Sequence, residues 1–144
     1  MPRPTQPNTT TLTPALRTAE GVQLMVDLFE CRGERQWLEQ ADNLRLACQA
    51  MVLAVGLTTV AVQFHQFEPV GVTGVVLLAE SHLAIHTWPE HDFVSIDLYV
   101  CNFSADNSAK AEQLVQDLIV LFGSQAPNIQ RAQRGRLPIA AMTS

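Results

Sequence analysis

Five short stretches of the chain have strand character, because their apolar residues recur at every second position or in brief unbroken runs. The stretches are residues 22–29, 59–67, 72–80, 82–88 and 93–101. Pro69 and Gly71 form a turn signal before the third stretch, and Pro89 separates the fourth from the fifth. The pattern therefore predicts strands joined by short turns and hairpins.

Two longer segments have the helical period instead. In residues 35–56 the apolar positions follow one helical face, and Gly56 is suited to ending the helix. These positions are Leu38, Ala41, Leu44, Cys48, Met51 and Val55. Residues 104–123 open with a Ser or Asp capping candidate and end at Gly123. Each segment is expected to form one helix.

Alternation along the strands assigns their side chains to two faces of a sheet. The apolar face is the expected core: Val22, Leu24, Val26, Leu28, Val60, Val62, Phe64, Leu83, Ile85, Val94, Ile96, Leu98 and Val100. Two helices can cover it, which predicts an α+β two-layer sandwich, an antiparallel sheet with helices packed on one face. The opposite face is mixed: Asp27, Gln63, His65, Phe67, His82, His86, Ser95, Asp97, Tyr99 and Cys101. A mixed face is compatible with solvent, a reactive pocket or a subunit interface.

The length of 144 residues and the 47% hydrophobic content fit a single domain, expected over residues 19–144. Residues 1–18 hold four prolines and no apolar core, so they are expected to be a disordered arm rather than a signal peptide. The apolar run at residues 50–62 is too short and too interrupted by threonine to span a bilayer. The prediction is a cytoplasmic chain with no membrane partner.

The net charge of −5 argues against a nucleic-acid partner, which would need clustered basic residues to displace counterions. The one small basic cluster, Arg131, Arg134 and Arg136, is interpreted as a solvated segment.

The three cysteines, Cys31, Cys48 and Cys101, are odd in number and lack the spacing of a disulfide framework. His82 and His86 lie four apart, with Glu90, His91 and Cys101 as further candidate ligands, but the residues between them indicate a strand rather than the helix of a zinc motif. No metal is therefore predicted. Ser81 lacks the glycine-flanked elbow of a serine hydrolase.

Three segments together resemble the prokaryotic S-adenosylmethionine decarboxylases, which are small pyruvoyl-dependent enzymes of polyamine synthesis. The segments are "GVQLMVDLFEC" at 21–31, "FHQFEPVGVTGVVLLAESHLAIHTWPE" at 64–90 and "VSIDLYVC" at 94–101. The stretch "AESHLAIHTWPE" is long and specific, whereas the arm and the tail after about residue 124 add little to the match. The resemblance implies a homodimer with active sites near its interface.

The resemblance also implies self-cleavage between Glu80 and Ser81. By analogy, the Ser81 hydroxyl attacks the Glu80 carbonyl, the peptide bond becomes an ester, and β-elimination followed by hydrolysis leaves a covalent pyruvoyl group at residue 81. Serine suits both steps, because its oxygen attacks first and leaves with the acyl group later. The pyruvoyl ketone condenses with the substrate amine as a Schiff base and accepts electrons as CO₂ departs.

Further roles follow from the same resemblance. His86 matches the proton acceptor in processing, Thr73 a hydroxyl that supports processing, and Cys101 the proton donor to the substrate carbon. Phe67 matches the aromatic residue that stacks on adenine, and Glu90 an acid that holds the ribose hydroxyls.

Three positions depart from the family pattern. Thr73 replaces the serine of "GVSG", while Val100 and Asn102 replace the threonine and glycine of "FTCG". Asn102 is expected to keep a left-handed turn, because asparagine tolerates that conformation. Strand parity also places Ser81 and His86 on opposite faces, so a bend at the cleavage site is expected to intervene. Two alternatives stay open: a pyruvoyl-dependent arginine or ornithine decarboxylase, and a non-processing binding or regulatory homologue.

Overall fold

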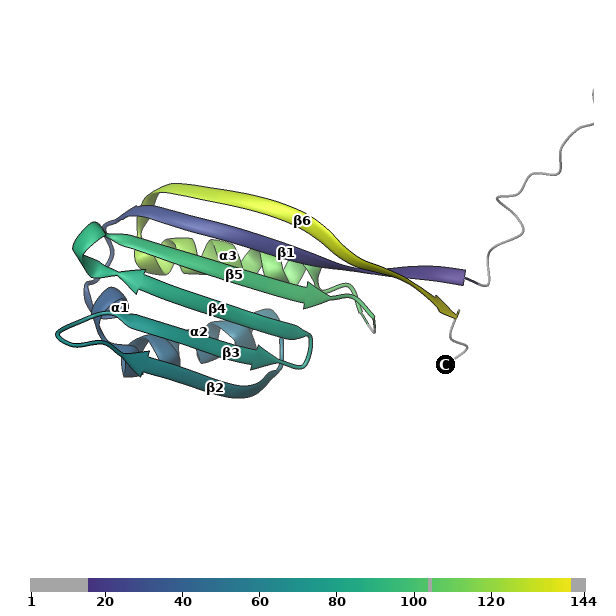
Figure 1. Cartoon of the computed structure of the whole chain (residues 1–144), viewed down its shortest axis with the longest axis horizontal. Helices are drawn as coiled ribbons and strands as arrows, with labels where there is room; N and C mark the ends of the chain where they lie inside the picture. Colours follow the sequence, from purple (N-terminus) through teal and green to yellow (C-terminus); the bar gives the residue numbers. More distant parts are fainter. Residues whose placement is uncertain (1–15, 104, 141–144) are drawn as a thin grey trace, which may run out of the picture.

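Six antiparallel strands form one sheet in the order β2-β3-β4-β5-β1-β6 (Figure 1). The structure is a computed structural model that describes residues 16–103 and 105–140. The elements are β1 (Leu16–Cys31), α1 (Gln36–Glu39), α2 (Ala41–Val55), β2 (Thr59–Gln66), β3 (Val72–Leu78), β4 (Ser81–Trp88), the 3₁₀ turn η2 (Pro89–His91), β5 (Phe93–Cys101), α3 (Ser108–Phe122) and β6 (Ser124–Ala140). The five strands expected from the sequence are all present.

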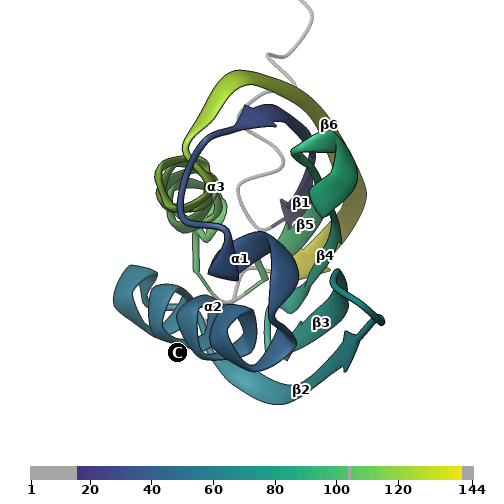
Figure 2. The same ribbon diagram turned by 90° about the vertical axis from the view of Figure 1, so that its left-hand side faces the viewer.

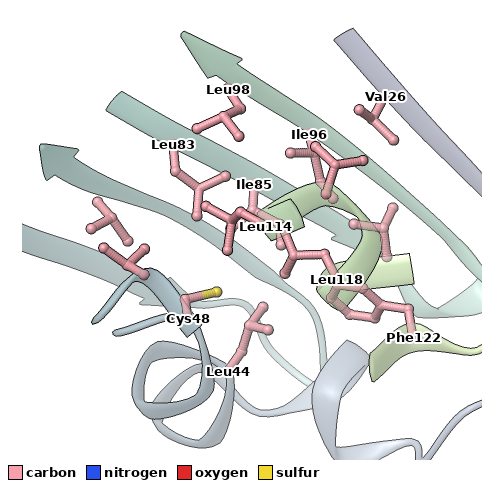
Figure 3. Close-up of a cluster of buried hydrophobic side chains, with 14 of the residues drawn as sticks. Val26, Leu44, Cys48, Leu83, Ile85, Ile96, Leu98, Leu114, Leu118 and Phe122 are labelled. Atoms are coloured by element: carbon pink, nitrogen blue, oxygen red, sulfur yellow. The ribbon is translucent and has the colours of Figure 1, made fainter. Parts of the chain in front are cut away.

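The helices cover one face of the sheet and leave the other face open (Figure 2). Between the layers, Leu44 and Cys48 of α2 and Leu114 and Leu118 of α3 meet the apolar side chains of the central strands (Figure 3). This arrangement confirms the predicted α+β two-layer sandwich. One expected core position is wrong: Val60 is exposed, and it lies where the register of β2 with β3 shifts, between Thr59 and Ala61. None of the described helices is long and apolar enough to cross a membrane.

The first helical segment is two helices rather than one. Gln40 adopts an extended conformation, with φ −117° and ψ 116°, and separates α1 from α2. At the far ends the expectation is confirmed, since Gly56 and Gly123 end α2 and α3 in the left-handed conformation. The helix break at Gln40 leaves the Glu39 carbonyl and the Ala41 amide without helical partners.

β6 was missed in the sequence, where residues 124–140 had no assigned structure. Pro127, Gly135 and Pro138 disfavour an internal strand, but β6 lies at the sheet edge, where proline is tolerated. The basic cluster lies on this strand: Arg131 pairs with Glu112 of α3, and Arg136 pairs with Glu20 of β1. The tail is therefore part of the sheet.

The sixth strand also explains the length of β1. β1 pairs with β5 on one side and with β6 on the other, and it begins at Leu16. Residues 16–18 therefore belong to a strand and not to the expected arm, while residues 1–15 lie outside the described residues.

We predict that Leu44→Ala lowers the free energy of unfolding by about 2–5 kcal/mol, because the Leu44 side chain is fully buried and its loss leaves a cavity. Leu46 lies on the same helix and is 58% exposed, so Leu46→Ala should change stability by less than about 0.5 kcal/mol. Urea unfolding followed by circular dichroism measures both values. Equal effects of the two substitutions would contradict the assignment of the core.

Candidate functional site

Ser81 is the first residue of β4 and follows a two-residue hairpin turn formed by Ala79 and Glu80. In this hairpin Ser81 pairs with Leu78 of β3 and, on its other side, with Val100 of β5. The Ser81 backbone has φ 156°, outside the usual range of strand residues. The side chain is half-buried, so the hydroxyl lies at the end of the sheet next to a tight turn.

The Glu80 carbonyl is held from the opposite strand. Its oxygen accepts a hydrogen bond of 2.9 Å from the Cys101 backbone N–H. The Glu80 carboxylate accepts a second bond, 3.0 Å long, from the Thr58 N–H, and the Ala79 N–H donates to the Thr58 carbonyl at 2.9 Å. The turn is therefore fixed on both sides, and the peptide bond before Ser81 has a donor directed at its oxygen.

His82 is the imidazole that contacts the Ser81 hydroxyl. The distance from Ser81 Oγ to His82 Nδ1 is 3.2 Å, and the His82 ring lies 6.1 Å from the Tyr99 ring. Sequence reasoning left His82 without a chemical role. Neighbouring residues of a regular strand point to opposite faces, but Ser81 has a φ of 156° and its hydroxyl contacts the His82 ring. Adjacency to Ser81 was the signal that could have identified this residue.

A pocket of about 350 Å³ lies at the other end of β4. Its lining includes four predicted site residues, Phe67, Thr73, His86 and Glu90, together with Trp88. Thr73 Oγ1 and His86 Nδ1 are 2.5 Å apart across the β3–β4 pair. The hydroxyl of Thr73 is thus engaged with the imidazole of His86, as a serine hydroxyl at this position could be.

The predicted site residues therefore form two groups in one protomer. Glu80, Ser81 and Cys101 lie at one end of β4, and Phe67, Thr73, His86 and Glu90 lie at the other. Beyond the cleavage site β4 is regular, because it pairs in unbroken register from Ser81 to Trp88, and the only irregular backbone of this described strand is at Ser81 itself, with φ 156°. Five residues of extended strand separate the two side chains by about 16 Å, at roughly 3.3 Å per residue.

The positions that depart from the family pattern have defined surroundings. Asn102 does not adopt a positive φ, so the expected left-handed turn is wrong. Instead, Asn102 Oδ1 accepts a 2.8 Å bond from the Asn107 N–H, and the Asn107 side chain donates to the Cys101 carbonyl at 2.8 Å. Asn102 thereby links the end of β5 to the start of α3. Val100 is fully buried in the core.

The three thiols differ in their surroundings, and none forms a disulfide. Burial raises the pKa of the Cys48 thiol to about 12. Burial, followed by the nearby Asp92 carboxylate, raises the pKa of Cys31 to about 11. Cys101 is only half-buried. Within the described residues, no cluster of three or more histidine, cysteine or acidic side chains could hold a metal ion.

The architecture is that of a two-layer α+β domain with polar side chains grouped at both ends of one central strand. The family model for S-adenosylmethionine decarboxylase matches residues 22–135. The chain is 39% identical over 122 residues to the S-adenosylmethionine decarboxylase proenzyme of Pseudomonas paraeruginosa, covering 82% of this chain and 70% of that one. The proenzyme of Thermodesulfovibrio yellowstonii is 36% identical, with 81% and 82% covered.

A solved structure gives the same result. The adenosylmethionine decarboxylase of Aquifex aeolicus superposes with a TM-score of 0.74 at 30% identity, covering 84% of this chain and 95% of that chain. The chain belongs to the S-adenosylmethionine decarboxylase family. The match to residue 135 also includes much of β6, so the expectation that the tail after residue 124 adds little is wrong.

We predict that a small alkylating reagent at a pH of about 8 modifies Cys101 in the folded protein and spares Cys31 and Cys48. The raised pKa values of the two buried thiols keep them protonated at this pH, and the thiolate is the reactive form. Peptide mass spectrometry identifies the modified residues, and all three thiols should react in denaturant. Modification of Cys48 as fast as Cys101 in the native state would contradict this assignment.

Proposed function

We propose that this chain is a self-processing proenzyme that cleaves itself between Glu80 and Ser81 and then decarboxylates S-adenosylmethionine. One observation supports this most directly: the Ser81 hydroxyl lies beside an imidazole while the preceding carbonyl accepts a backbone hydrogen bond. The named activity of the relatives supports the substrate. The product would serve as an aminopropyl donor for spermidine synthesis.

In the first step, Ser81 Oγ attacks the Glu80 carbonyl carbon, and the C–N bond to Ser81 breaks as an ester forms. Negative charge develops on the Glu80 oxygen during this attack, and the Cys101 N–H is already directed at that oxygen. His82 Nδ1, 3.2 Å from the hydroxyl, is placed to accept its proton, and the released Ser81 nitrogen takes up a proton. The turn holds the carbonyl in position throughout.

In the second step, a base removes the Cα proton of residue 81, and the ester oxygen leaves with the Glu80 carboxyl group. Hydrolysis of the remaining unsaturated residue releases ammonia and gives the pyruvoyl ketone. The residues fit such a group, because residue 81 becomes a half-buried chain start at the open end of a turn. The pyruvoyl group would supply an electrophilic carbonyl that condenses with the substrate amine and takes up electrons during loss of CO₂.

The pocket supplies the substrate contacts in this proposal. Phe67 is 46% exposed and lines the pocket, so its ring is free to stack on adenine. Glu90, on η2 at the same pocket, can accept hydrogen bonds from the ribose hydroxyls. Cys101 lies beside Ser81 on the neighbouring strand and serves as proton donor to the substrate carbon. In the elimination step of processing, His86, paired with Thr73, is the proposed acceptor of the Cα proton.

A homodimer would bring together the two groups of site residues that lie at opposite ends of β4. Ser81 and His86 are too far apart in one protomer to act together, but a second copy stacked on the open face with antiparallel strands would bring its pocket over the Ser81 of the first. A two-fold axis forms this combined site twice. Phe29, Leu77 and Trp88 expose apolar surface on that face, and the Phe93 ring stacks between Phe29 and Trp88 at 5.0 and 5.2 Å.

Cleavage would leave the two fragments interlocked. Residues 1–80 contribute β1, β2 and β3, whereas residues 81–144 contribute β4, β5 and β6. In the sheet, β3 pairs with β4, and β1 lies between β5 and β6, so separation of the fragments would break three complete ladders. The processed protein is therefore expected to keep the fold of the proenzyme.

We predict that the purified protein contains two fragments, residues 1–80 and 81–144, and that Ser81→Ala remains a single chain of 15.9 kDa. Alanine has no oxygen to attack the carbonyl, so neither the ester nor the ketone can form. Denaturing gels and intact mass spectrometry detect the fragments, and labelled CO₂ from carboxyl-labelled S-adenosylmethionine reports activity. An active protein with uncut Ser81 would refute the proposed mechanism.

The same assay separates the remaining alternatives. Release of CO₂ from arginine or ornithine, and not from S-adenosylmethionine, would identify a different decarboxylase with the same processing chemistry. A single uncut chain with no activity on any of these substrates would identify a non-processing homologue.

We predict that two inactive variants, Ser81→Ala and Phe67→Ala, recover activity when they are unfolded together and refolded as a mixture. In the mixed dimer, one site combines the intact Ser81 of one protomer with the intact Phe67 of the other, so about a quarter of wild-type activity should return under random pairing. Each variant refolded alone is the control. Absence of recovery in a mixture that forms mixed dimers would place both residues in the same protomer's site.

A further inference from the structure

The wall of the pocket that carries Phe67 is a loop between β2 and β3, formed by residues 67–71. Phe67 N–H donates to the Gly71 carbonyl at 2.8 Å, which closes the loop on itself. Gly71 lines the pocket next to Phe67. A Cβ on Gly71 would lie 3.7 Å from the Phe67 Cβ and 3.6 Å from Pro89 Cδ. The position of the Phe67 ring in the pocket therefore depends on how this loop is anchored.

The loop is anchored by the side-chain amide of Gln66, the last residue of β2. Gln66 Nε2 donates toward three backbone carbonyls: Glu39 at 2.7 Å, Phe67 at 3.0 Å and Gly71 at 3.1 Å. Gln66 Oε1 accepts the Ala41 N–H at 2.7 Å. The Gly71 N–H adds a longer bond of 3.3 Å to the Glu39 carbonyl.

Two of these partners are the backbone groups left free by the helix break at Gln40. The Glu39 carbonyl ends α1 and the Ala41 amide begins α2, and Gln40 offers no side-chain cap to either helix. One amide side chain satisfies both and joins them to the loop. A carboxylate cannot do this, because it has no donor for the three carbonyls, and a leucine has neither donor nor acceptor.

A second anchor reaches the same connection from β4. Thr87 is buried, its hydroxyl donates to the Leu38 carbonyl at 2.7 Å, and it accepts the Val72 N–H at 2.9 Å. Thr87 therefore holds the chain just after the loop, while Gln66 holds the loop itself. Loss of Gln66 should release the loop without unfolding the sheet.

We propose that Gln66 is a positioning residue for substrate binding: its amide holds the Phe67–Gly71 loop against the α1–α2 connection and thereby sets the stacking surface of the pocket. This inference rests on the proposed function for the identity of the substrate, but the anchoring of the loop does not. Gln66 acts through Phe67 and does not itself contact the reacting atoms.

We predict that Gln66→Leu raises KM for S-adenosylmethionine about tenfold with little change in kcat. The loop loses a stabilisation equal to about one net hydrogen bond, and this free energy corresponds to about a tenfold change in binding. Hydrogen exchange of peptides covering residues 67–72 should be faster in Gln66→Leu than in wild type. Gln116→Leu, an exposed substitution on α3, is the matched control and should leave both measurements unchanged.

Gln66→Glu supplies a signature that a merely destabilised protein would not show. Three carbonyls disfavour a carboxylate here and one N–H, that of Ala41, favours it, so the pKa of this glutamate should be raised above its usual value of about 4.3. Below that pKa the protonated acid keeps one donor and one acceptor, and above it the donor is lost. The ratio of its KM to the wild-type KM should therefore rise as the pH is raised through that pKa, whereas the Gln66→Leu ratio should stay constant.

The outcomes separate this inference from the proposed function. Unchanged exchange of residues 67–72 in Gln66→Leu would overturn the inference, even if the wild-type protein decarboxylates S-adenosylmethionine. Faster exchange would support the anchoring even if the wild type acts on another substrate. A lower kcat with an unchanged KM in Gln66→Leu would also overturn the positioning role.

Discussion

The unbroken pairing of β4 with both of its neighbours determines where every proposed catalytic group lies. β4 pairs with β3 on one side and β5 on the other, so Ser81 and His86 cannot approach each other by bending the strand. The hydrogen bonds that stabilise the sheet thus keep Ser81 and His86 at opposite ends of β4. A site that needs both ends of β4 must be completed from outside the protomer, which is why the open face matters as much as the core (Figure 2).

The same rigidity would favour the proposed cleavage at the turn. The Glu80 carbonyl, the Glu80 carboxylate and the Ala79 amide are each fixed by β5 or by Thr58, so the bond proposed to break would need little reorganisation before attack. Because β1 lies between strands of the other proposed fragment, a cut in the turn would remove one connection and leave every ladder in place. Tight packing and the proposed bond breakage are therefore compatible, because the cut would fall where no strand pairing is lost.

The sequence allowed the fold to be predicted, and the resemblance supplied the candidate site residues, but neither predicted how these residues divide between the two ends of β4. Period-two alternation located β2 to β5, and helical spacing located the residues of α2 that face the core, such as Leu44 and Cys48. β6 was not predicted, because it contains proline and glycine, which usually argue against a strand but are tolerated in an edge strand. His82 was missed because consecutive strand residues normally point to opposite faces, and the irregular backbone at Ser81 is seen only in the structure.

Gln66 shows a further limit of local patterns, because its role arises from a contact across 27 residues of sequence. The helical period of residues 35–56 continues through Gln40, so it gives no sign of the break there. The break frees the Glu39 carbonyl and the Ala41 N–H, and the side chain of Gln66 forms hydrogen bonds with both. The interruption and the loop anchor therefore share one side chain, because Gln66 satisfies the backbone groups freed at Gln40 and also binds the Gly71 carbonyl of the pocket wall. Gln66 thereby links the helical layer to the pocket.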